Sequence, residues 1–324
     1  MAVIWVRGLH DPPHPVVAGH HGAVTHERLR AELVAVVTAV TDGRPLVLTA
    51  DAGQRLPSGP LRTEHRSMQA GLRAWVEQQT RHRLGYVEQL YTFADPDRAG
   101  EGGRVVSVSY LGLTRTSSAD PPWCDWYAYF PWEDHRPGAE GPRIVLEQIV
   151  PALEAWAARG ADRDDCERRA LRTAVCFGVS GRPWSSDLSL QRYELLFEAE
   201  LIPEAGDDTD PVVGVPGDRM LGDHRRILAT AVGRVRAKIQ YHPVVFELMP
   251  ESFTLGQLQN TVEALAGQAL HKQNFRRLVT QQDLVEATGE TEQATGGRPA
   301  RLFRFRRAVL DERQVAGTQL PRAR

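Results

Sequence analysis

The stretch GPLRTEHRSMQAGLRAWVEQQTR, residues 59–81, decides how the first half of this chain folds. In its second part, apolar residues recur at helical spacing on one face, and the opposite face is polar. These apolar residues are Met68, Leu72, Trp75 and Val76. The stretch is therefore expected to form a loop and then a helix that packs on a core. An ordinary amphipathic helix with no further role is the alternative that these residues alone leave open.

The same stretch resembles the Nudix box, the signature of pyrophosphate-hydrolysing enzymes. The box reads Gly, five residues, Glu, seven residues, and then Arg-Glu-aliphatic-x-Glu-Glu-x-Gly. The matching positions are Gly59, Arg73, Trp75 in the apolar position, and Glu77. The differing positions are His65, Ala74 and Gln78, which replace carboxylates, and Thr80, which replaces the closing Gly. The resemblance covers the frame of the box but not its acidic residues.

Nudix hydrolysis requires Mg²⁺, which binds carboxylate, phosphate and water oxygens in near-octahedral geometry. Only Glu77 remains of the carboxylate cluster, and the imidazole of His65 is a poor ligand for a hard cation. We therefore expect no catalytic residues and no metal site, and a domain that binds a nucleotide without hydrolysing it.

Arginines in and beside the box are suited to a nucleotide, because a guanidinium group donates two parallel hydrogen bonds to phosphate oxygens. The candidate ligand-binding residues here are Arg62, Arg66, Arg73 and Glu77. For Arg73, an internal ion pair that orients Glu77 is the alternative.

The segment PPWCDWYAYFPWED, residues 121–134, is dense in aromatic side chains. Such side chains fill a core or a dimer interface, and they also stack on adenine. Core packing or an interface is the expected role for most of them, with Trp126 as the candidate for a ligand contact.

The composition is that of an ordinary globular protein, with 324 residues, a net charge of −2 and 42% hydrophobic residues. This length allows two domains. Three scattered cysteines without a CxxC pair favour free thiols in a reduced cytoplasm. No apolar run approaches the roughly 20 residues of a membrane span, so we expect no membrane contact.

Residues 26–160 are expected to form a degenerate Nudix-like, ligand-sensing domain, preceded by an irregular segment over 1–25 that is rich in Pro and His. Asp42-Gly43 between two β-rich runs predicts a hairpin ahead of the box. Strands are expected over 86–93 and 104–115 after it. This order predicts an α/β Nudix-like sandwich, a mixed sheet with helices.

A helical extension and linker is expected over 161–217. It follows a helix over 144–160, for which Gly160 is a plausible C-terminal cap. Pro, Gly and Asp gather over 203–218, which is typical of a linker.

An α+β winged helix-turn-helix domain is predicted over 218–310, followed by a polar tail over 311–324. A helix covers the start of this region, and a second one begins at Thr254 as its N-cap. Gly267 marks the tight turn to a third helix, in which Leu270, Phe275 and Leu278 are expected to point inward. LVEAT and RLFRFR then form a hairpin wing.

The third helix has the side chains of a DNA reader. Between His271 and Arg307 there are eight Lys or Arg against four Asp or Glu, in a chain that is slightly acidic overall. Phosphate contacts supply affinity, and Asn, Gln, Arg and Lys near the start of such a helix reach base edges. The expected base-reading residues are Lys272, Gln273, Asn274 and Arg276, and those expected to hold the DNA backbone are Arg277, Arg298 and Arg301. A winged helix used for protein contacts is the alternative.

Together the two halves resemble the Nudix-related transcriptional regulators of NAD metabolism of the NrtR/NadQ type. The C-terminal resemblance rests on FTLGQLQNTVEAL, HKQNFRRLV, ATG and GRPARLFRF, and the N-terminal resemblance on LPSGPLRTEHRSM, YVEQLYTFAD and DWYAYFPWED. It implies a dimeric DNA-binding repressor whose N-terminal domain senses an adenine nucleotide. In the shorter members of this group the nucleotide is ADP-ribose.

The expected function is therefore a DNA-binding regulator of NAD biosynthesis genes, acting as a repressor and not as an enzyme. No cofactor is expected, the effector is ADP-ribose, NAD or another adenine nucleotide, and the partners are operator DNA and a second copy of the chain. One alternative is a Nudix-type pyrophosphohydrolase with an unusual metal site. Another is a nucleotide-binding adaptor that contacts protein.

Overall fold

The structure is a computed structural model, and it describes residues 30–85, 87–94, 105–116, 122–206, 214–241, 244–292 and 299–306. The predictions for segment 1–25, for Arg298 and for the tail 311–324 lie outside these residues. Among the helices described, every one is too short or too polar to cross a lipid bilayer.

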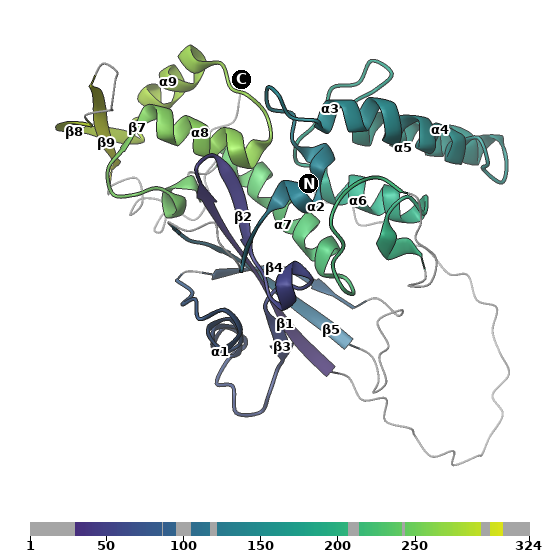
Figure 1. The fold of residues 1–324 in the computed structure, drawn as a ribbon, viewed down its shortest axis with the longest axis horizontal. Helices are drawn as coiled ribbons and strands as arrows, with labels where there is room; N and C mark the ends of the chain where they lie inside the picture. Colours follow the sequence, from purple (N-terminus) through teal and green to yellow (C-terminus); the bar gives the residue numbers. More distant parts are fainter. Residues whose placement is uncertain are drawn as a thin grey trace, which may run out of the picture.

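A mixed sheet forms the centre of the first half of the chain (Figure 1). Its order is β4-β5-β1-β2-β6, and β3 pairs with β1. The central strand β1 runs parallel to β5 and antiparallel to β2. The strands are β1 (Arg30–Thr41), β2 (Arg44–Leu48), β3 (Ser58–Pro60), β4 (Val87–Phe93), β5 (Val105–Leu113) and β6 (Trp123–Asp125).

The hairpin predicted at Asp42-Gly43 is confirmed. Both residues have positive φ, 51° and 70°, and Thr41 pairs with Arg44 across the turn. Such a turn matches the right-handed twist of the two strands that it joins.

Strand β1 is buried on both faces, because successive side chains point to opposite sides of a strand. Leu33 and Val37 belong to one apolar cluster, while Val34 and Val36 belong to another. Helices cover both faces of the sheet, and this double cover explains the continuous apolar run of β1.

The box helix α1 (Met68–Thr80) covers one face of the sheet, as predicted. Its side chains Leu72 and Val76 join the cluster of Leu33. The hydroxyl of Ser67 accepts a hydrogen bond from the Ala70 N–H and caps the helix. The box glycine Gly59 lies so close to α1 that a Cβ there would come within 2.3 Å of the Trp75 ring.

Helices gather on the opposite face and beside it (Figure 1). They are α2 (Trp126–Tyr129), α3 (Gly141–Ile144), the π-helical turn η4 (Val145–Ile149), α4 (Val150–Ala157), α5 (Arg163–Phe177), α6 (Ser189–Glu198) and α7 (His224–Tyr241). Short 3-10 turns complete this part at η1 (Asp51–Gly53), η3 (Pro131–Glu133) and η5 (Pro203–Ala205).

The predicted cap at Gly160 is wrong, because helix α4 ends at Ala157 and Ala158 is its C-cap. Gly160 instead lies against the next helix, where a Cβ would come within 2.7 Å of the Cys166 nitrogen. The glycine therefore permits a close approach of α5 and does not end α4.

Helix α7, grouped above with the winged helix, joins the two halves. Arg226 pairs with Glu194 of α6, and Lys238 pairs with Glu88 of β4. Within the described part of the predicted linker, Val215 is buried and donates its N–H to Leu201 O. One apolar cluster runs from β1 through α7 into the last helices, so packing shows no break at residue 218.

The winged helix-turn-helix is confirmed, and with it the predicted fold class. Its elements are η6 (Val244–Leu248), α8 (Leu255–Ala266), α9 (Lys272–Gln281), and a sheet of β7 (Phe253–Thr254), β9 (Ala300–Phe305) and β8 (Val285–Glu292) in that order. Thr254 caps α8 and forms a capping box with Gln257. Gly267 ends α8 with a φ of +68°.

Leu278, one of the three side chains expected to point inward from the third helix, points outward. The side chain of Leu278 is 50% exposed, and Val279 is buried in its place. Each residue turns a helix by about 100°, and on α9 this rotation places Val279 toward the core and Leu278 at the edge that faces solvent.

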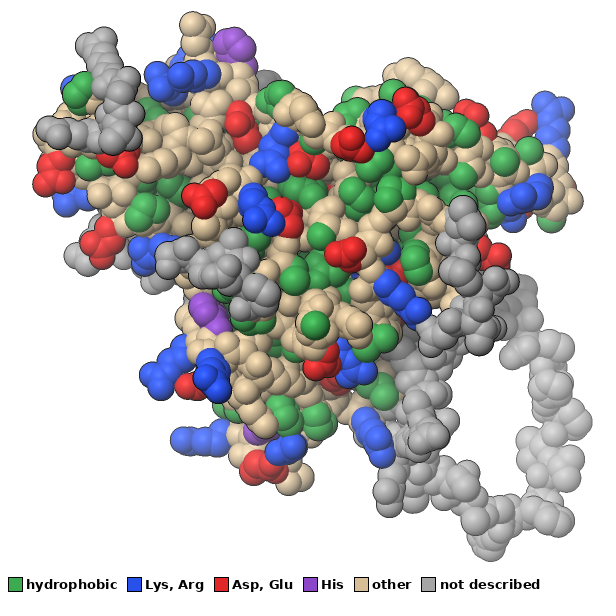
Figure 2. Space-filling model, in the orientation of Figure 1, with side chains coloured by type: hydrophobic (Ala, Val, Ile, Leu, Met, Phe, Trp, Pro, Cys, Tyr) green, Lys and Arg blue, Asp and Glu red, His purple; other side chains and the backbone are tan. Residues whose placement is uncertain are grey.

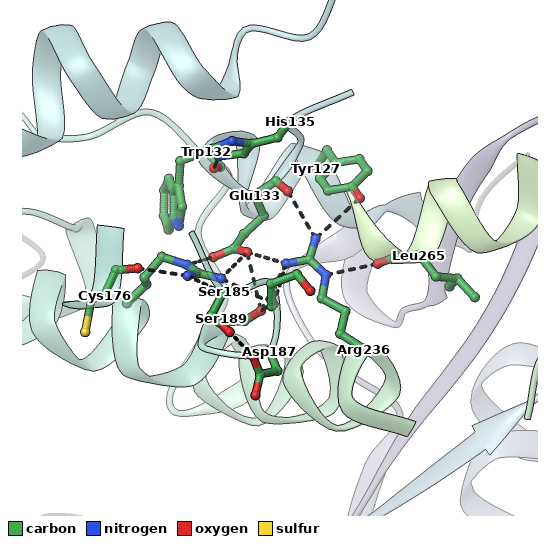
Figure 3. A network of polar contacts seen from close by, with 12 residues as sticks. Tyr127, Trp132, Glu133, His135, Cys176, Ser185, Asp187, Ser189, Arg236 and Leu265 are labelled. Carbon is green, nitrogen blue, oxygen red and sulfur yellow. Dashed lines mark hydrogen bonds and ion pairs between the residues drawn. The ribbon is translucent and has the colours of Figure 1, made fainter. Parts of the chain in front are cut away.

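A buried carboxylate joins α6, α7 and the end of α8 at one point (Figure 3). Glu133 lies between Arg192 of α6 and Arg236 of α7, and all three side chains are at most 1% exposed. Arg192 Nε donates to Glu133 Oε1 at 2.5 Å, and Arg236 Nη1 donates to Glu133 Oε2. Backbone carbonyls, including Cys176 O and Leu265 O, accept the remaining guanidinium protons. We call Glu133, Arg192 and Arg236 the Glu133 cluster.

The pKa of Glu133 is lowered in the fold. Burial alone raises it, but the charges of Arg192 and Arg236 outweigh that effect. A carboxyl with a lowered folded pKa adds stability above its unfolded pKa, and this stability is lost as the pH falls through the folded value.

We expect Glu133→Gln to lower the free energy of unfolding by about 3–5 kcal/mol at neutral pH, because two buried guanidinium groups lose their counter-charge. Urea unfolding measures this loss. The difference in unfolding free energy between the variant and the wild type should shrink as the pH falls below about 4.3, because the stability that ionised Glu133 adds to the wild type is lost. Glu167→Gln is the matched control, since Glu167 pairs with Arg163 where both side chains are more than half exposed. Equal losses in the two variants would contradict the prediction.

Candidate functional site

Helix α9 presents a polar and basic face to solvent. The exposed side chains include Lys272, Gln273, Asn274, Arg276 and Arg277, which were expected to point outward. Phe275 and Val279 point the other way and pack on the core. Figure 2 shows Lys and Arg side chains over the end of the molecule that α9 occupies in Figure 1.

The cations of α9 are not neutralised by the residues that the structure describes. Lys272, Arg276 and Arg277 form no ion pair with any residue that the structure describes. A paired cation is offset by its partner and attracts a distant anion weakly, whereas an unpaired surface cation attracts phosphates, most strongly at low salt. This helix therefore carries uncompensated positive charge suited to phosphates.

In the wing, by contrast, two of the arginines form ion pairs with nearby carboxylates. Arg304 pairs with Glu286 at 2.7 Å, and Arg306 pairs with Asp283. Arg301, a predicted backbone contact, is exposed and has no ion pair within the described part of the chain. The sequence count of basic residues therefore overstates the free charge of the wing.

The turn between α8 and α9 is held by residues that sequence reasoning missed. The Glu263 carboxylate accepts hydrogen bonds from the Leu270 N–H and from Gln259 Nε2, both at 2.8 Å. Gln259 Nε2 also donates to Leu270 O at 3.1 Å. The four-residue spacing of Gln259 and Glu263 is the one signal in the sequence, and it does not reveal the contact with the turn.

The box face of α1 lacks the geometry of a Nudix centre. Ala74, Glu77 and Gln78 are exposed, and Glu77 pairs with Arg83 at 2.9 Å. No group of three or more His, Cys, Asp or Glu side chains in the described residues is placed to hold a metal ion.

Arg73 does not pair with Glu77, so that alternative is wrong. Its Nη1 donates instead to Leu84 O and Gly85 O in the loop after α1. These bonds occupy one edge of the guanidinium and give Arg73 a structural role in bracing this loop.

Arg62 and Arg66 are exposed in the loop that leads into α1. The Arg62 guanidinium lies 4.4 Å from the centre of the Trp75 ring, and it pairs with exposed Glu64 at 3.7 Å. Such a surface pair is weak and can exchange for a phosphate. In Figure 2, Lys and Arg side chains gather at the end of the molecule where Figure 1 places α1.

The assignment of Trp126 to a ligand contact is wrong for this structure. Its side chain is fully buried in the main core, as are those of Phe130 and Trp132. A buried indole has no face on which adenine can stack. The aromatic segment therefore fills the core, the role expected for most of its members.

A polar cavity of about 300 Å³ lies between the loop after β2 and the end of α1. Its lining residues are Ala50, Asp51, Arg55, Leu56, Ser58 and Gln79. Asp51 and Ala52 in this loop have φ values of 50° and 55°, a conformation that non-glycine residues rarely adopt. Strained backbone of this kind is concentrated at functional sites.

Comparison with known proteins identifies the C-terminal winged-helix region. Residues 245–305 match the family described as the NrtR DNA-binding winged helix domain. The chain is 41% identical over 83 residues to the ADPR responsive transcriptional repressor NtrR of Acinetobacter baylyi. That match covers 26% of this chain and spans about a third (33%) of the repressor's length. The predicted resemblance to NrtR-type regulators is thereby confirmed.

Two solved structures align with most of the chain. Shewanella oneidensis NrtR in complex with a 27mer DNA aligns over 87% of this chain and 95% of its own, with 20% identity and a TM-score of 0.49. A MutT/nudix family protein from Enterococcus faecalis aligns over 88% and 90%, with 16% identity and a TM-score of 0.48.

We expect Gln273→Ala and Asn274→Ala to relax the base preference of the chain, because each good base contact discriminates by about 1–3 kcal/mol. Arg301→Ala should weaken binding to preferred and random DNA alike and lower the salt slope by about one. Selection of preferred sites from a random DNA pool measures the first effect, and titration at several salt concentrations measures the second.

The matched control is Gln281→Ala, the same substitution at the exposed far end of α9. It should leave the preferred site unchanged. If Gln273→Ala and Asn274→Ala also keep the wild-type preference, α9 does not read the bases.

Proposed function

We propose that this chain is a DNA-binding transcriptional repressor of NAD biosynthesis genes, controlled by ADP-ribose or a related adenine nucleotide. The observation that carries the proposal is the face of α9, where three cations without ion pairs in the described chain flank Gln273 and Asn274. This face belongs to a domain that matches the NrtR DNA-binding family. A winged helix used only for protein contacts has no need of this arrangement.

The proposal of a nucleotide effector rests on the first half of the chain. Arg62 and Arg66 lie within the Nudix-like box, both exposed and near the start of α1. The curated relative is named as ADPR responsive, and the same effector is proposed here. Ala74 and Gln78 stand where catalytic carboxylates are expected, so the nucleotide is bound and not cut.

A pair of chains is proposed to bind each operator. One helix-turn-helix reads only a short half-site, and two-fold symmetric proteins match palindromic DNA. The second copy doubles both the phosphate contacts and the bases that are read.

Footprinting tests the function. The full chain is incubated with DNA from upstream of its own gene and of NAD biosynthesis genes, with and without ADP-ribose, NAD and ATP. A protected palindrome whose occupancy changes with one of these nucleotides supports the proposal. Equal protection of all DNA, or no protection, overturns it.

Calorimetry should show binding of ADP-ribose, and Arg62→Ala and Arg66→Ala should each weaken it by about tenfold, which corresponds to about 1.4 kcal/mol for a lost charged hydrogen bond. Arg159→Ala is the matched control, since Arg159 is exposed beyond the end of α4 and far in sequence from the box. Absence of binding to ADP-ribose, NAD and ATP at millimolar concentration means that the box is vestigial.

Turnover of ADP-ribose or NAD should stay below about 1 per second with Mg²⁺ or Mn²⁺, the low end of ordinary enzymes. The reason is the loss of carboxylates at positions 65, 74 and 78. Release of AMP, followed by chromatography, measures it. Faster metal-dependent release would favour the pyrophosphohydrolase alternative.

A further inference from the structure

The C-terminal end of α8 is capped by residues outside the matched winged-helix domain. The last carbonyls of a helix lack partners within it. Here Ala264 O accepts from the Tyr127 hydroxyl at 2.7 Å, and Leu265 O accepts from Arg236 Nε at 2.9 Å. Gly267 O accepts from the His135 N–H at 2.7 Å. Three donors from α2, α7 and the segment after η3 therefore hold the helix that leads into α9.

This junction is tightly packed. A Cβ at Gly267 would come within 2.4 Å of Glu133 O and 2.7 Å of Arg236 Nη2. Gly267 also has a φ of +68°, which favours glycine. The turn into α9 therefore has one permitted position relative to Glu133 and Arg236.

The Glu133 cluster fixes the donor Arg236 (Figure 3). Arg236 binds both the carboxylate and, at 3.1 Å, the carbonyl of Glu133. Arg192 from the helical extension holds the same carboxylate and donates to Cys176 O and Ser185 O, each at 2.9 Å. The extension thus contributes the side chain that locks Glu133, and through Glu133 it locks Arg236 against α8.

The same two elements, α2 and α7, also reach the loop that lines the polar cavity. The Tyr129 hydroxyl donates to Gly53 O at 2.7 Å. The Leu56 N–H donates to His224 Nδ1, at the start of α7, at 3.3 Å. Rigid elements that contact two sites can carry a change from one to the other. The loop beside α1 and the end of α8 are joined in this way.

We infer that Tyr127 and Arg236 are positioning residues for the recognition helix. They hold α8, and through the Gly267 turn α9, on elements that contact the loop beside the box helix. Nucleotide binding near α1 then changes the placement of α9 on DNA. The helical extension serves this coupling by supplying Arg192. The inference rests on the proposed function, in which a nucleotide controls DNA binding.

The test uses Tyr127→Phe in the full chain, because this change removes one hydroxyl and keeps the aromatic ring. The matched control is Ser109→Ala, which removes a buried hydroxyl that donates to Tyr91 O at 2.8 Å within the sheet. The response is the ratio of operator affinities with and without ADP-ribose. Residues that carry coupling alter it by roughly 2- to 30-fold, so we expect Tyr127→Phe to reduce it about threefold or more.

Ser109→Ala should keep the wild-type response, since loss of a hydrogen bond in the sheet does not free α8. An unchanged response in Tyr127→Phe, or an equal reduction in Ser109→Ala, overturns the inference. General destabilisation does not explain the expected difference, because each variant loses a partly buried hydrogen bond but only Tyr127→Phe should change the response.

Hydrogen exchange separates this inference from the proposed function. If the wild-type chain binds no operator or ignores ADP-ribose, the proposed function fails, but the docking of α8 is still measured. Amides over 255–281 should exchange faster in Tyr127→Phe than in wild type and stay protected in Ser109→Ala. Equal exchange over 255–281 in the two variants overturns the positioning role.

Discussion

The fold depends on one carboxylate that has no access to water. Glu133 is paired with two guanidinium groups from α6 and α7, and a buried charge is tolerated only when it is paired and hydrogen-bonded. The segment after α2, the extension, α7 and the end of α8 must therefore meet at this point. An apolar contact would tolerate small shifts between these elements, whereas directed hydrogen bonds to Glu133 allow one arrangement.

Arginine serves opposite purposes inside and outside this arrangement. Arg192, Arg225 and Arg236 are fully buried, and each is paired with a carboxylate and with backbone carbonyls. Arg276 and Arg277 on α9 are exposed and form no ion pair in the described chain. The first group joins elements of the fold, and the second is free to attract phosphates. The same residue type thus supports both the rigid body and the proposed DNA contact, and burial separates the two roles.

Local features of the fold could be predicted from the sequence because their causes lie within a few residues. The Asp42-Gly43 turn needs two residues that accept positive φ, and the start of α8 needs Thr254 with Gln257 three positions later. The polar face of α9 follows from helical spacing, apart from Leu278, and the loss of the Nudix carboxylates follows from comparison with the box. From these features we could predict the fold class and the winged helix, and recognise the resemblance to NrtR-type regulators.

Tertiary structure alone decided which partner each long side chain meets. The partners of Arg73 lie in the loop after α1, Trp126 is enclosed by helices from later in the chain, and Arg236 reaches a carboxylate 103 residues away. A guanidinium has the same donors beside a phosphate, a carbonyl or a carboxylate, so residue type does not specify its partner. By itself, the sequence determined most of the elements, the caps at Thr254 and Gly267, and the chemistry available on α9. The packing of α6 and α7 around Glu133 determined where that chemistry is held, because burial and long-range contact form only when distant segments meet.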